Sequence, residues 1–109
     1  MAYDEKLAER VRQALGRRKG LTERKMFGGI AFMVGGNMCC GVVKNDLMVR
    51  VGPEQYEGFL GEPGTRPMDF TGRPMTGMLY VDGGALRNAK TLAQWVQHGA
   101  DYAASLPPK

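Results

Sequence analysis

Glycine-rich turns in the first half of the chain divide it into apolar runs that are too short for typical helices. Gly28-Gly29 precedes the apolar run 30–34, and Gly35-Gly36-Asn37 follows it. Glycine and asparagine tolerate the positive φ angles that tight hairpin turns require. Two further apolar runs cover residues 38–43 and 47–51, with a short polar turn between them. This pattern predicts three strands joined by two short turns, an antiparallel meander.

Three segments with helical signals surround this meander. Apolar residues recur at spacings of three and four over about residues 4–18, and a short helix is expected over 53–60. A final helix is expected from Asn88 until Pro107-Pro108 ends it. The proline-rich segment 61–74 predicts an ordered loop or an irregular edge strand, followed by a strand over 75–81. The expected fold is α+β, with helices packed on an antiparallel sheet in the order α-β-β-β-α-β(-β)-α.

The length of the chain fits one domain and leaves no room for a second. Its 109 residues, 43% hydrophobic and 24% charged, are typical of a folded globular protein. No apolar run approaches the ~20 residues of a membrane span. The segment Met1–Lys6 also lacks the apolar core of a secretory signal. We therefore expect one cytoplasmic domain over residues 1–109, with no membrane contact.

Few side chains suit catalysis or metal binding. His98 is the single histidine, Ser105 is the single serine, and Cys39 and Cys40 are adjacent in an expected strand. Alternation along a strand predicts that the two thiols point to opposite faces, where they are poorly placed to bridge each other or to share a metal. We expect no catalytic site, no metal and no cofactor. A thiol dyad of Cys39 or Cys40 with His98 is the enzymatic alternative.

The positive charge is concentrated near the N-terminus. The net charge is +4, and residues 1–25 carry eight basic and four acidic side chains, so the other 84 residues sum to neutrality. Five of these cations form a candidate site for nucleic acid or a protein partner. They are Arg17, Arg18, Lys19, Arg24 and Lys25. The alternative interpretation is that Arg17, Arg18 and Lys19 complement the negative end of the first helix dipole.

Methionine is concentrated in the sheet half of the chain. Seven of the eight methionines lie within residues 26–78. In the third expected strand, alternation sends Leu47, Val49 and Val51 to the core and leaves Met48 on the other face. If helices cover one face of the sheet, the other is a candidate partner or homodimer surface. The residues of this candidate surface are Met33, Met38, Met48, Arg50 and Met78. The alternative is that these methionines fill the core.

Several of these segments resemble the N-terminal domain of the TfoX/Sxy family. The resemblance rests on the runs Arg24–Met33, Gly36–Met38 and Leu47–Gly52, on the later segment Met68–Met75 and on the final helix with Leu92–Trp95. It covers about residues 5–106 and implies an α-β-β-β-α-β-β-α fold without catalytic residues. Full-length members of the family carry a second, helical domain, so we expect this chain to be a stand-alone N-terminal domain.

The resemblance also implies a role. TfoX/Sxy proteins regulate natural competence and act with the cyclic-AMP receptor protein at a subset of promoters. It therefore implies a non-enzymatic regulatory or interaction module whose partner is a protein near the transcription machinery. Direct binding of nucleic acid through the five basic residues is the second hypothesis, and a thiol-dependent enzyme is the third.

Overall fold

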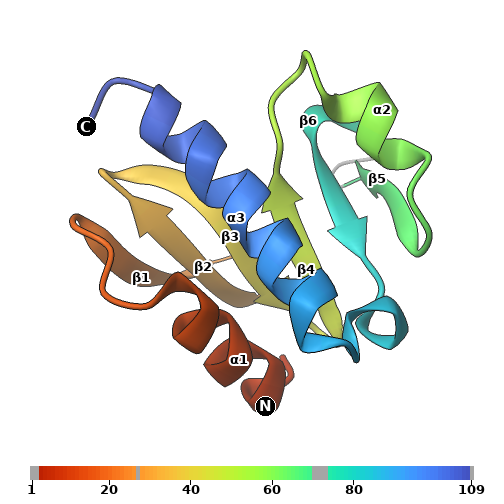
Figure 1. The fold of residues 1–109 in the computed structure, drawn as a ribbon, viewed down its shortest axis with the longest axis horizontal. Coiled ribbons are helices and arrows are strands. Elements are labelled where there is room, and N and C mark those ends of the chain that lie inside the picture. Colours follow the sequence, from red (N-terminus) through yellow and green to blue (C-terminus); the bar gives the residue numbers. More distant parts are fainter. Residues whose placement is uncertain (1–2, 27, 70–73, 109) are drawn as a thin grey trace.

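One antiparallel sheet of six strands carries three α-helices on the same face (Figure 1). The computed structural model describes residues 3–26, 28–69 and 74–108. Its helices are α1 (Glu5–Leu15), α2 (Tyr56–Leu60) and α3 (Ala89–Ser105), with the 3₁₀ turn η1 (Gly83–Leu86) before α3. Its strands are β1 (Leu21–Met26), β2 (Gly29–Val34), β3 (Asn37–Val43), β4 (Asp46–Arg50), β5 (Thr65–Asp69) and β6 (Pro74–Val81). They lie in the order β1-β2-β3-β4-β6-β5, and the predicted α+β class, with helices packed on an antiparallel sheet, is confirmed.

The structure adds a strand, β1, in front of the predicted meander. It pairs with β2 from Leu21 opposite Val34 to Met26 opposite Gly29. Residues 22–25 are all polar, so the segment lacks the apolar alternation by which a half-buried strand is recognised. β1 forms one edge of the sheet, where charged side chains are common because they prevent pairing with other chains.

The first helix ends earlier than its apolar pattern predicts. Gly16 follows α1 with φ 63° and ψ −139°, a conformation that stops the helix. Arg17, Arg18 and Lys19 therefore lie beyond the helix, and the basic residue of its last turn is Arg12. The interpretation that the three later cations complement the dipole of this helix is wrong. At the other end, the Asp4 side chain accepts hydrogen bonds from the backbone N–H groups of Lys6 and Leu7, as an N-cap does.

The other edge of the sheet is β5, which lies in the proline-rich segment. Of the two predictions for this segment, an ordered loop or an irregular edge strand, the edge strand is confirmed for residues 65–69. β5 pairs with β6, and its register shifts between Pro67 and Asp69. Proline cannot donate a ladder hydrogen bond, so an edge strand is its ordinary place in a sheet. Residues 70–73 of the predicted segment lie outside the described residues.

The core lies between the sheet and the helices. The buried stripe of α1 and the buried face of α3 pack on the strand residues that point to the same side. Leu47, Val49 and Val51 belong to this core and Met48 does not, as alternation along β4 predicts. Burial of so many aliphatic and aromatic side chains supplies most of the driving force for folding.

A β-bulge in β3 reverses the prediction for the two cysteines. Cys40 lies opposite Phe32, whereas Met38 lies opposite Met33, so Cys39 is an extra residue in the ladder. Both cysteines consequently face the helices, both are fully buried, and their Sγ atoms are 3.7 Å apart. The expectation that they point to opposite faces is wrong, because simple alternation does not hold across a bulge.

The bulge is also the point where α3 approaches the sheet most closely. A Cβ atom on Gly99 would overlap the carbonyl oxygen of Cys39. Since both groups belong to the backbone, neither can move aside without shifting the helix or the strand. Glycine is therefore required at position 99 for α3 to lie at this distance.

We expect Gly99→Ala to lower the free energy of unfolding by about 2 kcal/mol, because the cost of overpacking exceeds the gain in helix propensity. Chemical denaturation monitored by circular dichroism measures this change. Gly58→Ala in α2 is the matched control, since a Cβ there has no atom within 4 Å. The control should raise the free energy of unfolding by about 0.5 kcal/mol. Equal stability of Gly99→Ala and the native chain would contradict the proposed close contact.

Candidate functional site

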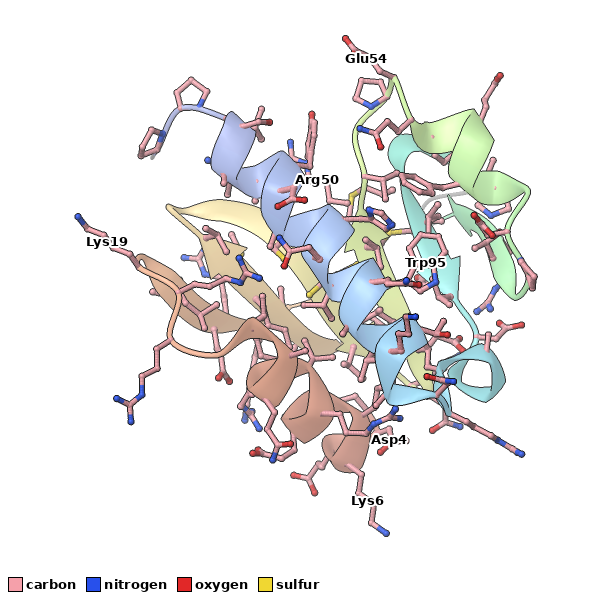
Figure 2. The ribbon with its side chains drawn as sticks, viewed as in Figure 1. Asp4, Lys6, Lys19, Arg50, Glu54 and Trp95 are labelled. Carbon is pink, nitrogen blue, oxygen red and sulfur yellow. The ribbon has the colours of Figure 1, made fainter. Side chains whose placement is uncertain are left out.

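The turn between α1 and β1 presents two of the five predicted cations freely to solvent. Arg17 and Lys19 are exposed, and Figure 2 shows Lys19 pointing away from the molecule. Arg18 turns inward instead, where its Nη2 donates a hydrogen bond of 2.6 Å to Oε1 of Gln97 on α3. The guanidinium of Arg18 thus ties the turn to α3, and it is less available to a phosphate than its neighbours.

Arg24 and Lys25 lie on opposite faces of β1. Glu23 faces α1, because its carboxylate accepts hydrogen bonds of 2.8 and 2.9 Å from Arg12. Alternation places Lys25 on that same side and Arg24 on the other side of the sheet. The structure therefore does not bring the five predicted cations into one patch: Arg17 and Lys19 share the turn, and the other three diverge.

Five methionines lie on the sheet face that no described helix covers. Met48, Met68 and Met78 form a buried cluster there, with Met38, Val43 and Tyr80 packed against it. Met33 lies opposite Met38 in the β2–β3 ladder and adds to the same face. We call this set the methionine face: Met33, Met38, Met48, Met68, Met78, Val43 and Tyr80.

Only part of the methionine face is accessible. Met48 and Met68 are 0% exposed and Met78 is 7% exposed, so these side chains fill space in the fold. Met33, Met38, Val43 and Tyr80 are half-buried and form its accessible part. Met68 was not among the predicted residues, although its place in β5 follows from alternation once that strand is recognised. The interpretation that methionines fill the interior thus applies to Met48, Met68 and Met78, whereas Met33 and Met38 stay accessible as the surface interpretation requires.

The arginines near this face have local partners. Arg66 hydrogen-bonds to Asp82 and, at 2.6 Å, to Asp46, and its guanidinium lies 4.8 Å from the centre of the Tyr80 ring. The hydrogen bond to Asp46 raises the pKa of Arg66. The guanidinium of Arg50, a predicted site residue, lies 5.3 Å from the centre of the Tyr102 ring of α3. Arg50 thus sits where the methionine face meets the C-terminal half of α3, beside a hollow of about 300 Å³ that Met38 and Met78 also line.

Two hollows that the sequence analysis did not predict lie along α3, one on each side of the contact between Phe59 of α2 and His98 of α3. Phe59, Trp95 and His98 form an aromatic cluster at that contact, with ring centres 4.6 to 5.8 Å apart. His98 lines two hollows, of about 370 and 390 Å³, that extend from it in the two directions along α3. Figure 2 shows Trp95 beside α3 and Glu54 in the loop that leads into α2. We call these two hollows together the α2–α3 groove.

The thiols are separated from the groove by α3 itself. The Sγ of Cys39 lies 3.9 Å from the carbonyl oxygen of Val96, beneath the helix, whereas His98 is exposed on its outer side. The contact with Cys39 and burial raise the pKa of Cys40 well above its ordinary value. This environment disfavours the thiolate that a catalytic dyad needs.

In the part of the chain that the structure describes, no cluster of three or more His, Cys, Asp or Glu side chains is placed to hold a metal ion. Among the same residues, no helix is long and apolar enough to cross a membrane.

The fold and the family comparison agree. The structure defines an α+β domain with its helices on one face of an open sheet and a methionine-rich second face. The family model described as the TfoX N-terminal domain matches residues 13–103. This match spans most of the chain, which therefore belongs to the TfoX N-terminal domain family. Comparisons with curated proteins and with solved structures gave no significant match.

We expect the native protein to resist thiol labelling, because both cysteines are fully buried and out of contact with reagent and the pKa of Cys40 is raised. In a titration with Ellman's reagent near pH 7.5, the native chain should react far more slowly than the unfolded chain, which exposes two thiols. Cys39→Ala and Cys40→Ala variants assign any residual reaction to one residue. Rapid labelling of either cysteine in the native protein would favour the thiol-enzyme hypothesis instead.

Proposed function

We propose that this protein is a non-enzymatic interaction module in the cytoplasm that contacts a protein partner near the transcription machinery. The observation that carries the proposal is the accessible part of the methionine face, on the side of the sheet away from the helices. Membership of the TfoX N-terminal domain family supports the regulatory context, since competence and transcription regulation are the roles that the TfoX/Sxy resemblance implies.

The chemistry of the methionine face suits an apolar protein surface. Methionine is unbranched and polarisable, so half-exposed Met33 and Met38 can adjust to partners of different shape. Val43 and Tyr80 extend the same apolar area across the sheet toward β6. A second copy of this chain is the alternative partner at this face, and a measurement of the oligomeric state tests that alternative.

Site-specific photocrosslinking tests the proposal. A photoreactive amino acid at position 33 should crosslink to a subunit of RNA polymerase or to a DNA-binding transcription regulator in native lysate. Met38→Gln should reduce that crosslink severalfold without unfolding the chain, because the side chain is only half-buried. The matched control carries the probe at Lys6, which is exposed on α1 and points away from the sheet (Figure 2).

The outcome separates the hypotheses. Crosslinks from position 33 that contain only a second copy of this chain would favour the homodimer. Crosslinks to neither a transcription protein nor a second copy, with a folded control, would contradict the proposal.

Direct nucleic-acid binding remains the second candidate because the charge excess is concentrated in the first 25 residues. Since the described structure spreads the five cations over several directions, we expect weak, sequence-independent binding that disappears as salt is raised from about 50 to 200 mM. Fluorescence anisotropy with a labelled DNA duplex measures this, and Arg17→Gln with Lys19→Gln should remove most of the low-salt signal. Affinity that persists at the higher salt concentration would favour direct recognition of nucleic acid.

A further inference from the structure

We infer that the α2–α3 groove binds an extended peptide segment of a partner protein, with a basic side chain at one end and an apolar side chain at the other. This inference rests on the proposed function in that it describes a protein contact, but it concerns a surface on the opposite side of the sheet from the methionine face. The argument uses the length of the groove, its charge and its aromatic cluster.

The length of the groove fits a peptide better than a small molecule. On the α3 side it extends from Thr91 to Ser105. Fourteen residues of helix rise about 21 Å, which corresponds to six or seven residues of extended chain. Residues that line the two hollows recur on α3 at spacings of three and four, so they form one stripe along the helix, in which Trp95 is buried and His98, Asp101 and Ser105 are exposed.

The hollow near the C-terminal end of α3 is acidic. Glu54 and Asp101 line it together with Tyr102 and Ser105. The wider segment 51–65, which forms the opposite wall, contains three glutamates and no lysine or arginine. Among the described residues, none of these four carboxylates forms an ion pair. A positively charged side chain placed here would gain partners that the chain itself does not supply.

The Asp101 side chain is restrained by one hydrogen bond, which leaves Oδ2 without a hydrogen-bond donor among the described residues. Its Oδ1 accepts a hydrogen bond of 2.6 Å from Nε2 of Gln97, one turn earlier on α3. Gln97 is in turn oriented by Arg18, which donates to its Oε1 at 2.6 Å. This chain of hydrogen bonds lowers the conformational entropy that Asp101 loses when it binds a cation.

The other hollow has an aromatic base and a mixed wall. Phe59 and Trp95 meet edge to face, with ring centres 5.4 Å apart, Pro63 and Ala85 add apolar lining, and Glu62, Thr91 and Gln94 add polar lining. Trp95 is 6% exposed, so its ring forms a firm surface at the base of the hollow. An aliphatic side chain inserted here would be covered on several sides, which is the arrangement in which apolar contacts stabilise a complex most.

The two hollows are spaced for nearby residues of one peptide. Trp95 and Asp101 are six residues apart on α3, about 9 Å along the helix axis. Three residues of extended chain cover about 10 Å. A basic and an apolar residue three positions apart therefore reach both hollows at once.

A second copy of this chain fits less well. Its most basic exposed segment is the turn Arg17-Arg18-Lys19, which could meet the acidic hollow. That turn has no apolar residue among its three positions, and Arg18 is already bound to Gln97. It would leave the aromatic hollow empty, so a segment from another protein is the better occupant.

Synthetic peptides test the inference. The probes are two acetylated, amidated six-residue peptides with arginine and leucine three positions apart, in either order, on a glycine and serine background. Trp95 is the only tryptophan, so its fluorescence reports on the groove directly. We expect a saturable change in emission with at least one probe, and at least tenfold weaker binding when glutamate replaces its arginine.

Matched variants localise the binding. Glu54→Gln with Asp101→Asn should weaken the probe at least fivefold, because it removes both carboxylates of the acidic hollow. Both residues are exposed, so the variant should keep its fold, which circular dichroism checks. Glu57→Gln removes one charge from α2, three residues after Glu54 but outside the groove lining, and it should change the affinity less than twofold.

Several results would overturn the inference. Equal binding of the arginine and glutamate peptides, or equal effects of Glu54→Gln/Asp101→Asn and Glu57→Gln, would show non-specific attraction only. Binding of spermidine as tight as that of the peptide, with the same dependence on Glu54 and Asp101, would identify a polyamine site. Self-association that Arg17→Gln with Lys19→Gln abolishes would identify a second copy as the occupant.

The proposal for the groove and the proposal for the methionine face can be tested separately. Met33→Gln should leave the affinity of the arginine peptide unchanged, since Met33 lies on the other side of the sheet and lines neither hollow. Loss of the transcription-protein crosslink with intact peptide binding would contradict the proposed function alone. Loss of peptide binding with an intact crosslink would contradict this inference alone.

Discussion

The contact between α3 and the bulge in β3 is the constraint on which the rest of the arrangement depends. Gly99 lets the helix backbone rest against the carbonyl oxygen of Cys39, and the bulge turns both cysteines into the space beneath the helix. With α3 lying across the middle strands, α1 packs along one side of it, and the α2–α3 groove lies along the other (Figure 1). A single close backbone contact thus sets the position of the groove and the burial of the thiols.

The placement of all three helices on one face gives the two sides of the sheet different chemistry. The helical side holds the aliphatic and aromatic core and, at its surface, a basic turn beside α1 and an acidic segment around α2. These two charged regions lie at opposite ends of the helical side (Figure 1). The other side holds the methionine face, of which Met33, Met38, Val43 and Tyr80 are half-exposed. A partner with an apolar surface and a partner with a basic segment would therefore approach this domain from different directions.

Local signals predicted most of the elements and the shared face of four predicted methionines, but not β1 or the bulge in β3. The glycine turns located the hairpin between β2 and β3, and Asn88 caps α3 through a hydrogen bond to the backbone N–H of Lys90. β1 was missed because its central residues are polar, and the bulge was missed because one extra residue leaves no mark in an apolar run. The five cations were grouped by proximity in sequence, but strand alternation and the bond between Arg18 and Gln97 separate them.

The sequence by itself determined what depends on neighbouring residues: the turns, the helix caps, the alternation along β4 and the family to which the chain belongs. Tertiary structure alone decided which distant residues meet. Trp95 meets Phe59, Gln97 meets Arg18, and Glu54 and Asp101 line one hollow only because α3 folds back across the sheet. The physical reason is that side-chain packing and backbone approach join segments many residues apart, and such contacts leave no periodic signal in either segment.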